Sequence, residues 1–523
     1  MQTVDERNLF RTDTELNAAR VRYEKSLKDK NPTFENGYPI LLPTKPLDFI
    51  IDDDEDQVYV AENGFVIQRV NLKTGKINAT FKGHTGPVTS IALYNHRISN
   101  QQQRKILFTG SWDKTIKTWD AKTQILLSST TGHVDFVKSI EIIPNHGILA
   151  SGSTDRDIRL WDLKAILRKL DWCHIDNQYS IRKEAIHDTN QDQTFCNSNA
   201  IESKAAFAML DLPSPLSSVI NTPSLKERTQ WPSALYDAIA CIGILKSHTR
   251  PVDILKAHPM VTASEQETRV TNQTGSLHHL LISADTMGAL KIWRLENTLT
   301  VLDSTTWPHK TSINDIQVGC EVRHDIDHQT NAQLWTASAD NSVLLSTVDL
   351  LPISNKRITN LIRIEQPYYV RCLLSLPLYM AKAQSQLNYP NWLLTGSTDE
   401  KIRICDLEEL EDKKSETKPR STPNSAPGVI PSDWMSCLSA HWHEVNCLGV
   451  WHDKSSRKLW LISSSLDGTL RRWELSELER YLKQKVTPLG PSPVEQSAAP
   501  KGSGIIFTEE EEAELAELVN GMS

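Results

Sequence analysis

The sequence has no hydrophobic run long enough to cross a membrane. Its 523 residues are 39% hydrophobic, with a mean hydropathy of −0.40, and no apolar stretch approaches the roughly 18 residues that a membrane helix needs. The first residues, MQTVDERNLFRTD, carry charges where a signal peptide needs an apolar stretch. We therefore expect a protein of the cytoplasm or the nucleus that does not enter a membrane.

Paired cysteines and excess positive charge are missing as well. The eight cysteines stand singly, without a C-x-x-C pair, so we expect reduced thiols rather than a disulfide framework or a zinc ribbon. Cys320, His324 and His328 have a ligand-like spacing, but they lie in an expected loop that implies no fourth ligand, and we predict no metal site. The formal net charge of −8 makes direct binding of nucleic-acid backbones an unfavoured hypothesis.

Phosphate-binding and nucleophile motifs are absent too. The chain has no Gly-rich phosphate loop and no recognisable nucleophile elbow. We therefore expect neither an enzyme nor a bound cofactor.

What the chain does contain is a repeated pattern: Gly-His or its remnant, an apolar strand, a Ser/Asp turn, and Trp-Asp. The clear copies are GHTGPVTSIAL … LFTGSWDKTIKTWD at 83–120 and GHVDFVKSIEII … LASGSTDRDIRLWD at 132–162, and four weaker copies follow. A period of roughly 40 to 50 residues with about four short strands indicates a propeller blade. The pattern resembles the WD-repeat family over about residues 38–480, which implies an all-β, seven-bladed β-propeller.

The seventh blade comes from the segment before the first copy. Residues 47–76 alternate as three short strands and KINATFKGH supplies a fourth, whereas the last copy ends near Glu474 without an outer strand. An open blade would expose an unpaired edge. Similarity to the family implies that the short apolar run 38–42 provides that strand and closes the ring.

Four positions recur at fixed spacing in the best copies, with Ser or Thr ten and Asp six residues before Trp. In the family these side chains form a hydrogen-bonded chain, so we interpret them as structural and not as a catalytic triad. They are His84, Thr109, Asp113 and Trp119; His133, Ser151, Asp155 and Trp161; and His441, Ser463, Asp467 and Trp473.

The other copies are incomplete. The fourth keeps His248, Ser283 and Trp293 but has Met287 at the Asp position; the fifth has Ser346 for Trp; the sixth has Gln366 for His and Cys405 for Trp. We expect these blades to rely on packing rather than on the network.

Insertions and aromatic residues divide the two faces of the expected ring. The long insertions, about 165–240 and 410–433, follow third strands of blades, whereas the turns between second and third strands stay short on the opposite face. That face carries aromatic side chains: Trp112 in a turn, and Tyr368, Tyr369 and Trp442 at blade entries. We predict that these four bind a partner, although they could also pack beneath adjacent loops.

Both ends are expected to lie outside the ring. Residues 1–37 form an N-terminal extension with an amphipathic helix, and 481–506 form a flexible linker rich in Pro, Gly and Ser. Residues 507–523 form an acidic helix, opened by a capping box at Thr508 and Glu511. Its apolar stripe, predicted to bind a partner, consists of Leu515, Leu518, Val519 and Met522.

These features favour a non-enzymatic scaffold or adaptor that binds protein partners in a multiprotein complex through the propeller face and the C-terminal helix. A substrate receptor of a ubiquitin-ligase complex is one alternative. Its usual signature places Arg at the second position after Trp-Asp, where this chain has Lys122 and Lys164. A ribosome-assembly or RNA-linked factor is another alternative.

Overall fold

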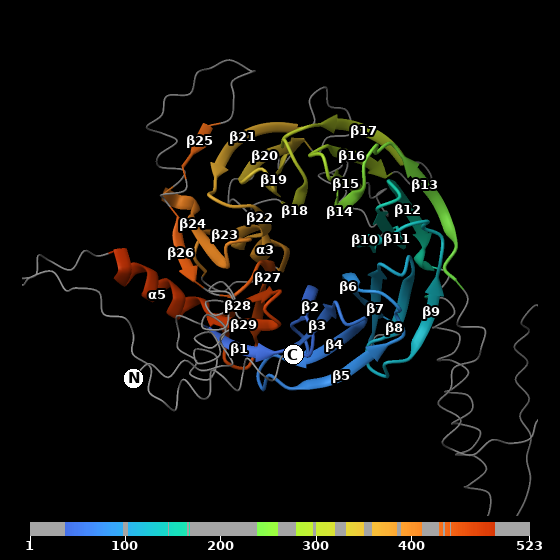
Figure 1. Ribbon diagram of the computed structural model, residues 1–523, viewed down its shortest axis with the longest axis horizontal. Helices are drawn as coiled ribbons and strands as arrows, with labels where there is room; N and C mark the ends of the chain where they lie inside the picture. The colour runs from blue at the N-terminus through green and yellow to red at the C-terminus, as the bar shows by residue number, and fades with distance from the viewer. Residues whose placement is uncertain are drawn as a thin grey trace, which may run out of the picture.

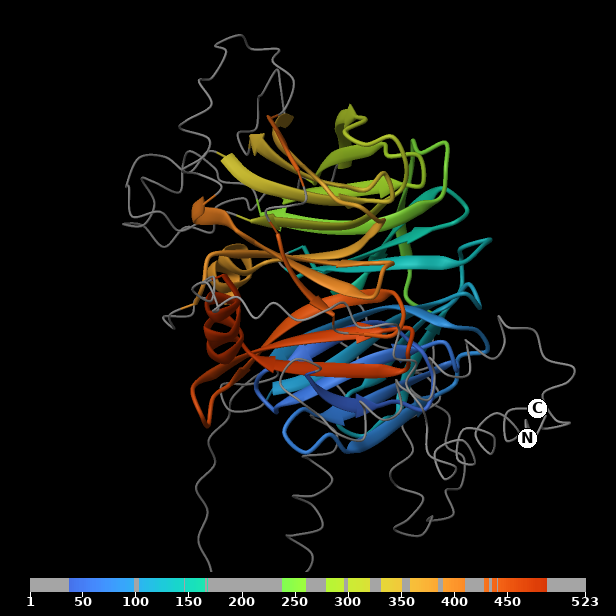
Figure 2. The ribbon, with the colours of Figure 1, turned by 60° about the vertical axis from the view of Figure 1, so that its left-hand side comes forward.

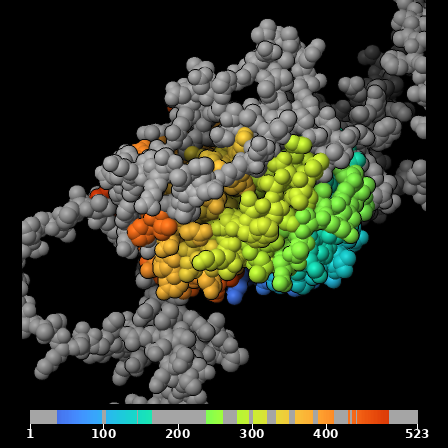
Figure 3. Space-filling model, turned by 90° about the horizontal axis from the view of Figure 1, so that it is seen from above, coloured from blue at the N-terminus to red at the C-terminus, as the bar shows by residue number. Residues whose placement is uncertain are grey.

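The computed structural model describes residues 37–97, 103–144, 146–164, 167, 238–259, 279–295, 300–319, 331–349, 358–383, 389–409, 428–431, 435–439 and 441–486. Within these ranges seven sheets stand around a central axis (Figure 1). Seen edge-on, the outer surfaces of neighbouring blades follow one another around the rim in chain order (Figure 3). The predicted seven-bladed propeller is confirmed.

Each blade is built on four antiparallel strands, numbered here from the axis outward, and the sheet of the fifth blade has one further strand at its outer edge. Blades one to three are β2 (Pro46–Asp52), β3 (Gln57–Glu62), β4 (Val66–Asn71), β5 (Ile77–Lys82); β6 (Val88–Arg97), β7 (Gln103–Ser111), β8 (Ile116–Asp120), β9 (Leu126–Thr130); and β10 (Val137–Ile143), β11 (Ile148–Ser153), β12 (Asp157–Asp162), β13 (Cys241–Lys246). Blades four and five are β14 (Val252–Pro259), β15 (His279–Asp285), β16 (Leu290–Leu295), β17 (Thr300–Thr306); and β18 (Ile313–Gly319), β19 (Asn331–Ser338), β20 (Ser342–Asp349), β21 (Ile358–Glu365). Blades six and seven are β22 (Val370–Ser375), β23 (Trp392–Ser397), β24 (Lys401–Asp406), β26 (Ser436–Ser439); and β27 (Val445–Asp453), β28 (Lys458–Ser465), β29 (Thr469–Glu474), β1 (Tyr38–Leu41).

The hydrophobic core lies between the blades. Seven clusters of buried side chains fill the described interfaces, and each cluster joins residues of two neighbouring sheets. Both faces of a sheet are therefore covered, which explains why second strands such as β3 are buried at every position instead of alternating. Phe81 and Trp119 illustrate the packing across the first interface, with ring centroids 6.0 Å apart.

Polar side chains of the innermost strands also connect neighbouring blades. The Asp48 carboxylate accepts the Ile91 N–H at 3.1 Å, and the Ser90 hydroxyl accepts the Ile140 N–H at 2.9 Å. Burial raises the pKa of Asp48 to about 6, while the positive charge of Lys256 partly offsets this rise. Burial acts to lower the pKa of Lys256, but the surrounding carboxylates hold it above its ordinary value. The inner wall thus holds partly buried charges of both signs.

The two ends of the ring are joined by β1. It pairs antiparallel with β29, with Tyr38 opposite Arg472 and Leu41 opposite Thr469, which confirms the predicted closure. Ile40 points into the cluster shared by the last and first blades and is 3% exposed, whereas Leu41 is 69% exposed. The Leu42 N–H extends the pairing by donating to the Gly468 carbonyl at 2.9 Å.

Three elements were not predicted. Strand β25 (Gly428–Ile430), inside the predicted insertion 410–433, pairs parallel with the outer strand β21 of the preceding blade. Helix α3 (Leu376–Ala383) follows β22, and helix α5 (Leu475–Val486) follows β29 and packs at the end of β28 and β29 (Figure 2). The predicted boundary between propeller and linker at 480 therefore falls inside a helix.

The predicted hydrogen-bonded chain is present in the second and third blades. His84 lies 2.7 Å from Asp113 and 2.8 Å from Thr109, whose hydroxyl accepts the Trp119 indole N–H at 2.9 Å. Because that hydroxyl accepts from Trp119, it is free to donate to the His84 Nε2, and Nδ1–H then donates to Asp113. In the third blade the same contacts measure 2.8, 2.7 and 2.8 Å.

The expectation that the incomplete copies lack this network was wrong for the fourth and fifth blades. Asp285, two residues before Met287, lies 3.0 Å from His248, and Ser283 accepts the Trp293 N–H at 2.8 Å. Asp285 thus takes the place of the missing carboxylate. It also accepts the N–H groups of Met287 and Ala289, and these bonds hold its carboxylate within the turn.

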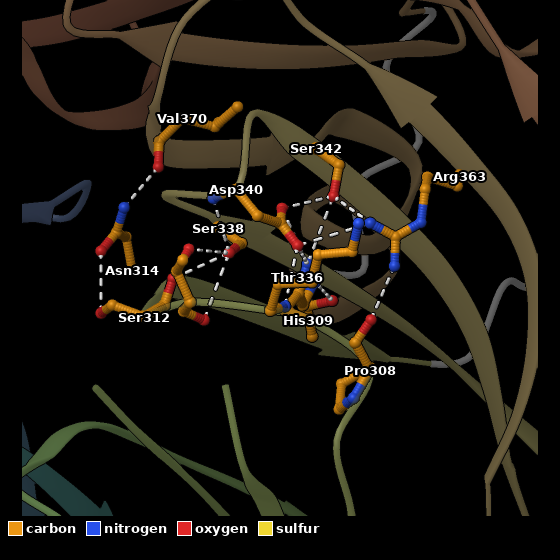
Figure 4. A network of polar contacts seen from close by, with 12 residues as sticks. Pro308, His309, Ser312, Asn314, Thr336, Ser338, Asp340, Ser342, Arg363 and Val370 are labelled. Carbon is orange, nitrogen blue, oxygen red and sulfur yellow. Dashed lines mark hydrogen bonds and ion pairs between the residues drawn. The ribbon is translucent and has the colours of Figure 1, made fainter. Parts of the chain in front are cut away.

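In the fifth blade His309 contacts both Asp340 and Thr336, at 3.0 and 2.8 Å (Figure 4). Arg363 donates to Ser342 at 2.7 Å and lies 3.4 Å from Asp340, so a cation from the outer strand joins the network.

The sixth and seventh blades depart from the pattern in different ways. Gln366 donates to Thr395 at 2.8 Å, while Arg403 pairs with Asp399 at 2.5 Å. His441 contacts Asp467 and Ser463 at 2.9 and 2.6 Å, but the Trp473 indole N–H has no hydrogen-bond partner among the described residues. The chain predicted for the seventh blade is therefore one bond short.

Candidate protein-binding face

One face of the ring is made by the turns between second and third strands and by the links that enter each blade; we call it the turn face. These segments share an end of the ring because neighbouring strands are antiparallel. Each turn has three or four residues, from 63–65 in the first blade to 466–468 in the last. Short turns anchored on buried strands make a rigid surface.

The turn face gathers large exposed hydrophobic side chains. The remaining exposed hydrophobic residues among those described lie on the strands that form the rim. The side chains on the turn face are Phe65, Trp112, Val134, Phe136, Met287, Trp307, Tyr368 and Tyr369. Those on the rim are Tyr38, Leu41, Ile77, Ile242, Ile244, Leu302, Leu361 and Val429.

Trp112 and Phe136 form an aromatic pair between the second and third blades. Their ring centroids are 5.1 Å apart with an interplanar angle of 17°, and the rings are 39% and 38% exposed. The Lys138 ammonium lies 6.0 Å from the Trp112 ring. The Trp112 N–H donates to the Pro87 carbonyl at 3.0 Å, which fixes the turn. The predicted residue Trp112 is thus held in place by a neighbour yet still reaches the surface.

Tyr368 and Tyr369 occupy the link into the sixth blade and are 53% and 55% exposed. The Tyr369 carbonyl accepts the Thr398 N–H at 3.1 Å, so the link is tied to the turn of the same blade. Trp307, in the preceding link, is more exposed still, at 69%. Sequence reasoning overlooked Trp307. The available signal was its position two residues before His309, which places it in the link that enters the fifth blade.

Trp442 differs from the other three predicted residues. Its side chain is half-buried, its ring lies 5.5 Å from the Arg471 guanidinium, and its backbone N–H donates to the Asp467 carboxylate at 3.1 Å. Trp442 is therefore partly a support for the interior of its blade. The four predicted residues lie on one face, but on three different blades.

The His–Ser/Thr–Asp sets beneath this face do not form reactive sites. Thr109 and Ser151 are fully buried, and each hydroxyl is engaged by a histidine and a tryptophan. Burial acts to raise the pKa of Asp113, but hydrogen bonding and attraction to His84 hold it well below its usual range; burial lowers the pKa of His84. A neutral histidine beside an ionised carboxylate stabilises the blade and leaves no accessible nucleophile.

Several predicted features lie outside the described residues. These are the N-terminal helix, most of the 165–240 insertion, the Cys320, His324 and His328 group, and the C-terminal stripe Leu515, Leu518, Val519 and Met522. Among the described residues no group of three or more His, Cys, Asp or Glu side chains is placed to hold a metal ion. No helix in the described ranges has the length and apolarity to span a membrane.

Sequence comparisons agree with this architecture. Residues 75–120, 124–162 and 433–474 match the family described as WD domain, G-beta repeat. A WD repeat-containing protein of Schizosaccharomyces pombe is 32% identical over 155 residues, which are 28% of this chain and 40% of that protein. The COMPASS component SWD3 of Saccharomyces cerevisiae is 32% identical over 92 residues, which are 18% of this chain and 27% of that protein. The chain therefore contains three segments that match WD repeats, and they lie within a seven-bladed β-propeller.

Proposed function

We propose that this propeller is a non-enzymatic scaffold or adaptor that binds protein partners through its turn face. The observation that carries the proposal is the concentration of exposed aromatic side chains on that face: among the described residues all of them except Tyr38 lie there. Desolvated aromatic anchors provide much of the binding energy at protein interfaces, about 2 kcal/mol or more each. WD-repeat propellers generally serve as interaction scaffolds rather than as catalysts.

The distribution of these residues favours a protein partner over a small ligand. Phe65, Trp112, Met287, Trp307 and Tyr368 belong to different blades, so they are spread around the ring. A small molecule binds in one concave site lined by converging groups, whereas a protein or an extended peptide can contact several blades at once. Predicted contacts at Trp112, Tyr368, Tyr369 and Trp442 form part of this footprint.

The proposal is tested by purifying tagged full-length variants from cells and quantifying their partners by mass spectrometry. Replacing Trp307 and Tyr368 by Ala should reduce at least one abundant partner about tenfold or more, since each anchor contributes about 2 kcal/mol. Replacing Ile242 and Leu302 by Ala is the matched control, because these side chains are exposed on the rim. Thermal midpoints should stay close to the wild type for both pairs. Unchanged partners in the turn-face variant would refute the proposal.

A second contact is proposed at the C-terminal segment. The capping box at Thr508 and Glu511, together with the stripe of Leu515, Leu518, Val519 and Met522, favours a short helix that binds a partner. Changing Leu515 and Leu518 to Asp should remove at least one partner, while changing Glu510 and Glu517 to Ala should not. If the Asp variant keeps the same partners as the Ala variant, the segment is a solubilising tail and not a binding helix.

The same partner sets distinguish the alternative functions. Ligase adaptor subunits would indicate a ubiquitin-ligase substrate receptor, although Lys122 and Lys164 stand where that group usually has Arg. Pre-ribosomal proteins would indicate a ribosome-assembly or RNA-linked factor. The similarity to a relative named as a COMPASS component supports membership of a multiprotein complex, but the match covers only 27% of that relative. Fluorescence microscopy of the tagged chain tests the proposed cytoplasmic or nuclear location.

A further inference from the structure

Part of the turn face carries exposed cationic side chains without a partner; we call it the basic half. The second to fifth blades follow one another around the ring, and each presents such a cation on this face. Within the described residues none of the four side chains forms an ion pair. They are Lys114 and Arg156, in the turns of the second and third blades, and Arg250 and Lys310, in the links that enter the fourth and fifth.

The backbone fixes the positions of these cations, while their side chains stay in water. The N–H groups of Lys114 and Arg156 each donate to the carbonyl of a serine three residues earlier, both at 3.1 Å. The Lys310 N–H donates to the Asp340 carboxylate at 3.1 Å. The charges of the basic half are therefore held on a rigid frame and are available to a ligand.

The carboxylates beneath the basic half do not neutralise the exposed cations. Each of these carboxylates faces the histidine of its own blade, at 2.7 to 3.0 Å. A second cation, from the third or the outer strand of the same sheet, lies close enough to act on that histidine or carboxylate. The pairs of inner cation and carboxylate are Lys117 and Asp113, Arg159 and Asp155, Lys291 and Asp285, and Arg363 and Asp340. The exposed cation of each blade is thus additional to a balanced pair.

Other carboxylates near the basic half are engaged or half-buried. Asp253 lies 3.9 Å from the Lys138 ammonium and accepts the Ser312 hydroxyl at 3.1 Å. Asp135 and Asp157 are half-buried. On the sixth and seventh blades the cations themselves are paired, which makes the two parts of the turn face different. Those pairs are Arg371 with Glu444 at 3.2 Å and Arg403 with Asp399 at 2.5 Å.

Large exposed hydrophobic side chains share the turns and links of the basic half. They are Trp112, Val134 and Phe136 in the second and third blades, Met287 in the fourth and Trp307 in the fifth. Since the four cations lie on four blades, they do not converge on one small anion. The combination suits an extended ligand in which negative and hydrophobic groups are interspersed.

This positive surface does not follow from the composition, because the chain has a net charge of −8. Complementary charge accelerates association and selects the partner. A nucleic acid would match the cations, but the aliphatic side chains of Val134 and Met287 among them favour a protein. Building on the proposed function, we propose that the basic half binds an extended acidic segment of a protein partner. Its Asp and Glu side chains meet the four cations, and its hydrophobic side chains meet the exposed rings of Trp112 and Trp307.

Selection from a phage-displayed library of random peptides, each about 16 residues long, on the purified full-length protein tests this proposal. The selected peptides should contain Asp and Glu at least about twofold more often than the unselected library, together with large hydrophobic residues. Fluorescence anisotropy then gives the Kd of one enriched peptide. Replacing Arg250 and Lys310 by Ser should weaken binding about three- to tenfold, as expected for the loss of two exposed ion pairs.

Replacing Lys76 and Lys122 by Ser is the matched control and should leave the Kd unchanged. These two lysines are also exposed, but they lie in turns between third and fourth strands, at the opposite end of the ring. Raising the salt from about 50 to about 200 mM should weaken the wild type more than the Arg250 and Lys310 variant, because screening acts on the charges that the variant lacks. Thermal midpoints of both variants should equal that of the wild type.

A selection that yields no peptide or no enrichment in Asp and Glu, or a Kd that the Arg250 and Lys310 variant leaves unchanged, would overturn the acidic partner. Selected peptides that still require Trp307 and Tyr368 would in that case leave the proposed function standing, whereas peptides that require neither would count against both proposals. A single-stranded oligonucleotide that binds as tightly as the peptide and is weakened by the same variant would identify a nucleic acid instead. A tenfold gain in peptide affinity for the chain ending at residue 506 would make the chain's own acidic tail the occupant and would also overturn the proposal.

Discussion

Replacing Ile40 by Ala should destabilise the ring far more than replacing its neighbour Leu41. Ile40 is 3% exposed in the cluster between the last and first blades, where it packs with Val58, Leu72 and Leu470, whereas Leu41 is 69% exposed. The two residues are adjacent in β1, so a strand that alternates its faces points them in opposite directions. The pair therefore measures how much the closing strand contributes through burial.

The expected magnitude follows from the atoms removed. Changing Ile to Ala deletes three carbons, which at about 0.8 kcal/mol each accounts for about 2.4 kcal/mol of transfer free energy. The remaining cavity adds to this, giving about 3 to 4 kcal/mol in total, within the range of about 2 to 5 kcal/mol for such core changes. Leu41→Ala removes side-chain atoms that are mostly in water and should change the free energy of unfolding by less than about 0.5 kcal/mol.

Urea denaturation of the two full-length variants and the wild type, followed by circular dichroism, gives the comparison. A lower midpoint with an unchanged slope for Ile40→Ala would show lost native stability and not an altered denatured state. If the two variants agree within about 0.5 kcal/mol, β1 does not stabilise the ring by burying Ile40. The reversed order would mean that β1 is displaced by one residue, because such a slip would bury Leu41 instead.

Three further predictions follow from the fold. Deleting residues 1–45, which removes β1, should lower the thermal midpoint by many degrees and cause aggregation, whereas deleting 1–30 should do neither; scanning fluorimetry that finds equal midpoints would contradict the closure. Asp285→Ala should cost about 1 to 3 kcal/mol in urea denaturation because it leaves His248 without its acceptor, while Met287→Ala should be nearly neutral. Burial raises the pKa of Asp48 to about 6, so the folded state holds more protons than the unfolded state between pH 4 and pH 6. The stability of the wild type relative to Asp48→Asn should therefore fall by about 3 kcal/mol as the pH rises through that window, and a pH-independent difference would show that Asp48 is not buried as an acid.

The repeat spacing was sufficient to predict the blades because a buried hydrogen-bonded chain fixes the distance between its members. Thr109 and Trp119 lie on adjacent strands in direct contact, and the number of residues between them cannot change without breaking the bond. The same argument failed for the carboxylate of the fourth blade. Asp285 lies at the end of a strand rather than inside the turn and still reaches His248, so a fixed spacing was too strict a criterion.

The turn face and the extra strand were only partly predictable. Trp112, Tyr368 and Tyr369 could be placed on one face because the direction of each strand follows from the repeat, but exposure depends on packing between blades. Phe136 was therefore overlooked, although it stacks on Trp112. Strand β25 has three residues and pairs with a different blade from the one that precedes it in sequence, so no local pattern marks it.

The joining of the two chain ends has a consequence for synthesis of the protein. Asn446 donates to the Pro46 carbonyl across the closing interface, although the two residues are 400 positions apart in the sequence. At translation rates of about 5 to 20 residues per second, the first blade waits about 20 to 80 s before its last neighbour leaves the ribosome. During that time the closing face of the first blade stays exposed, with β1 still unpaired, and exposed edges promote pairing with other chains. We therefore expect nascent chains to need protection by a chaperone, and ribosome-bound chains stalled before residue 445 to be captured by one.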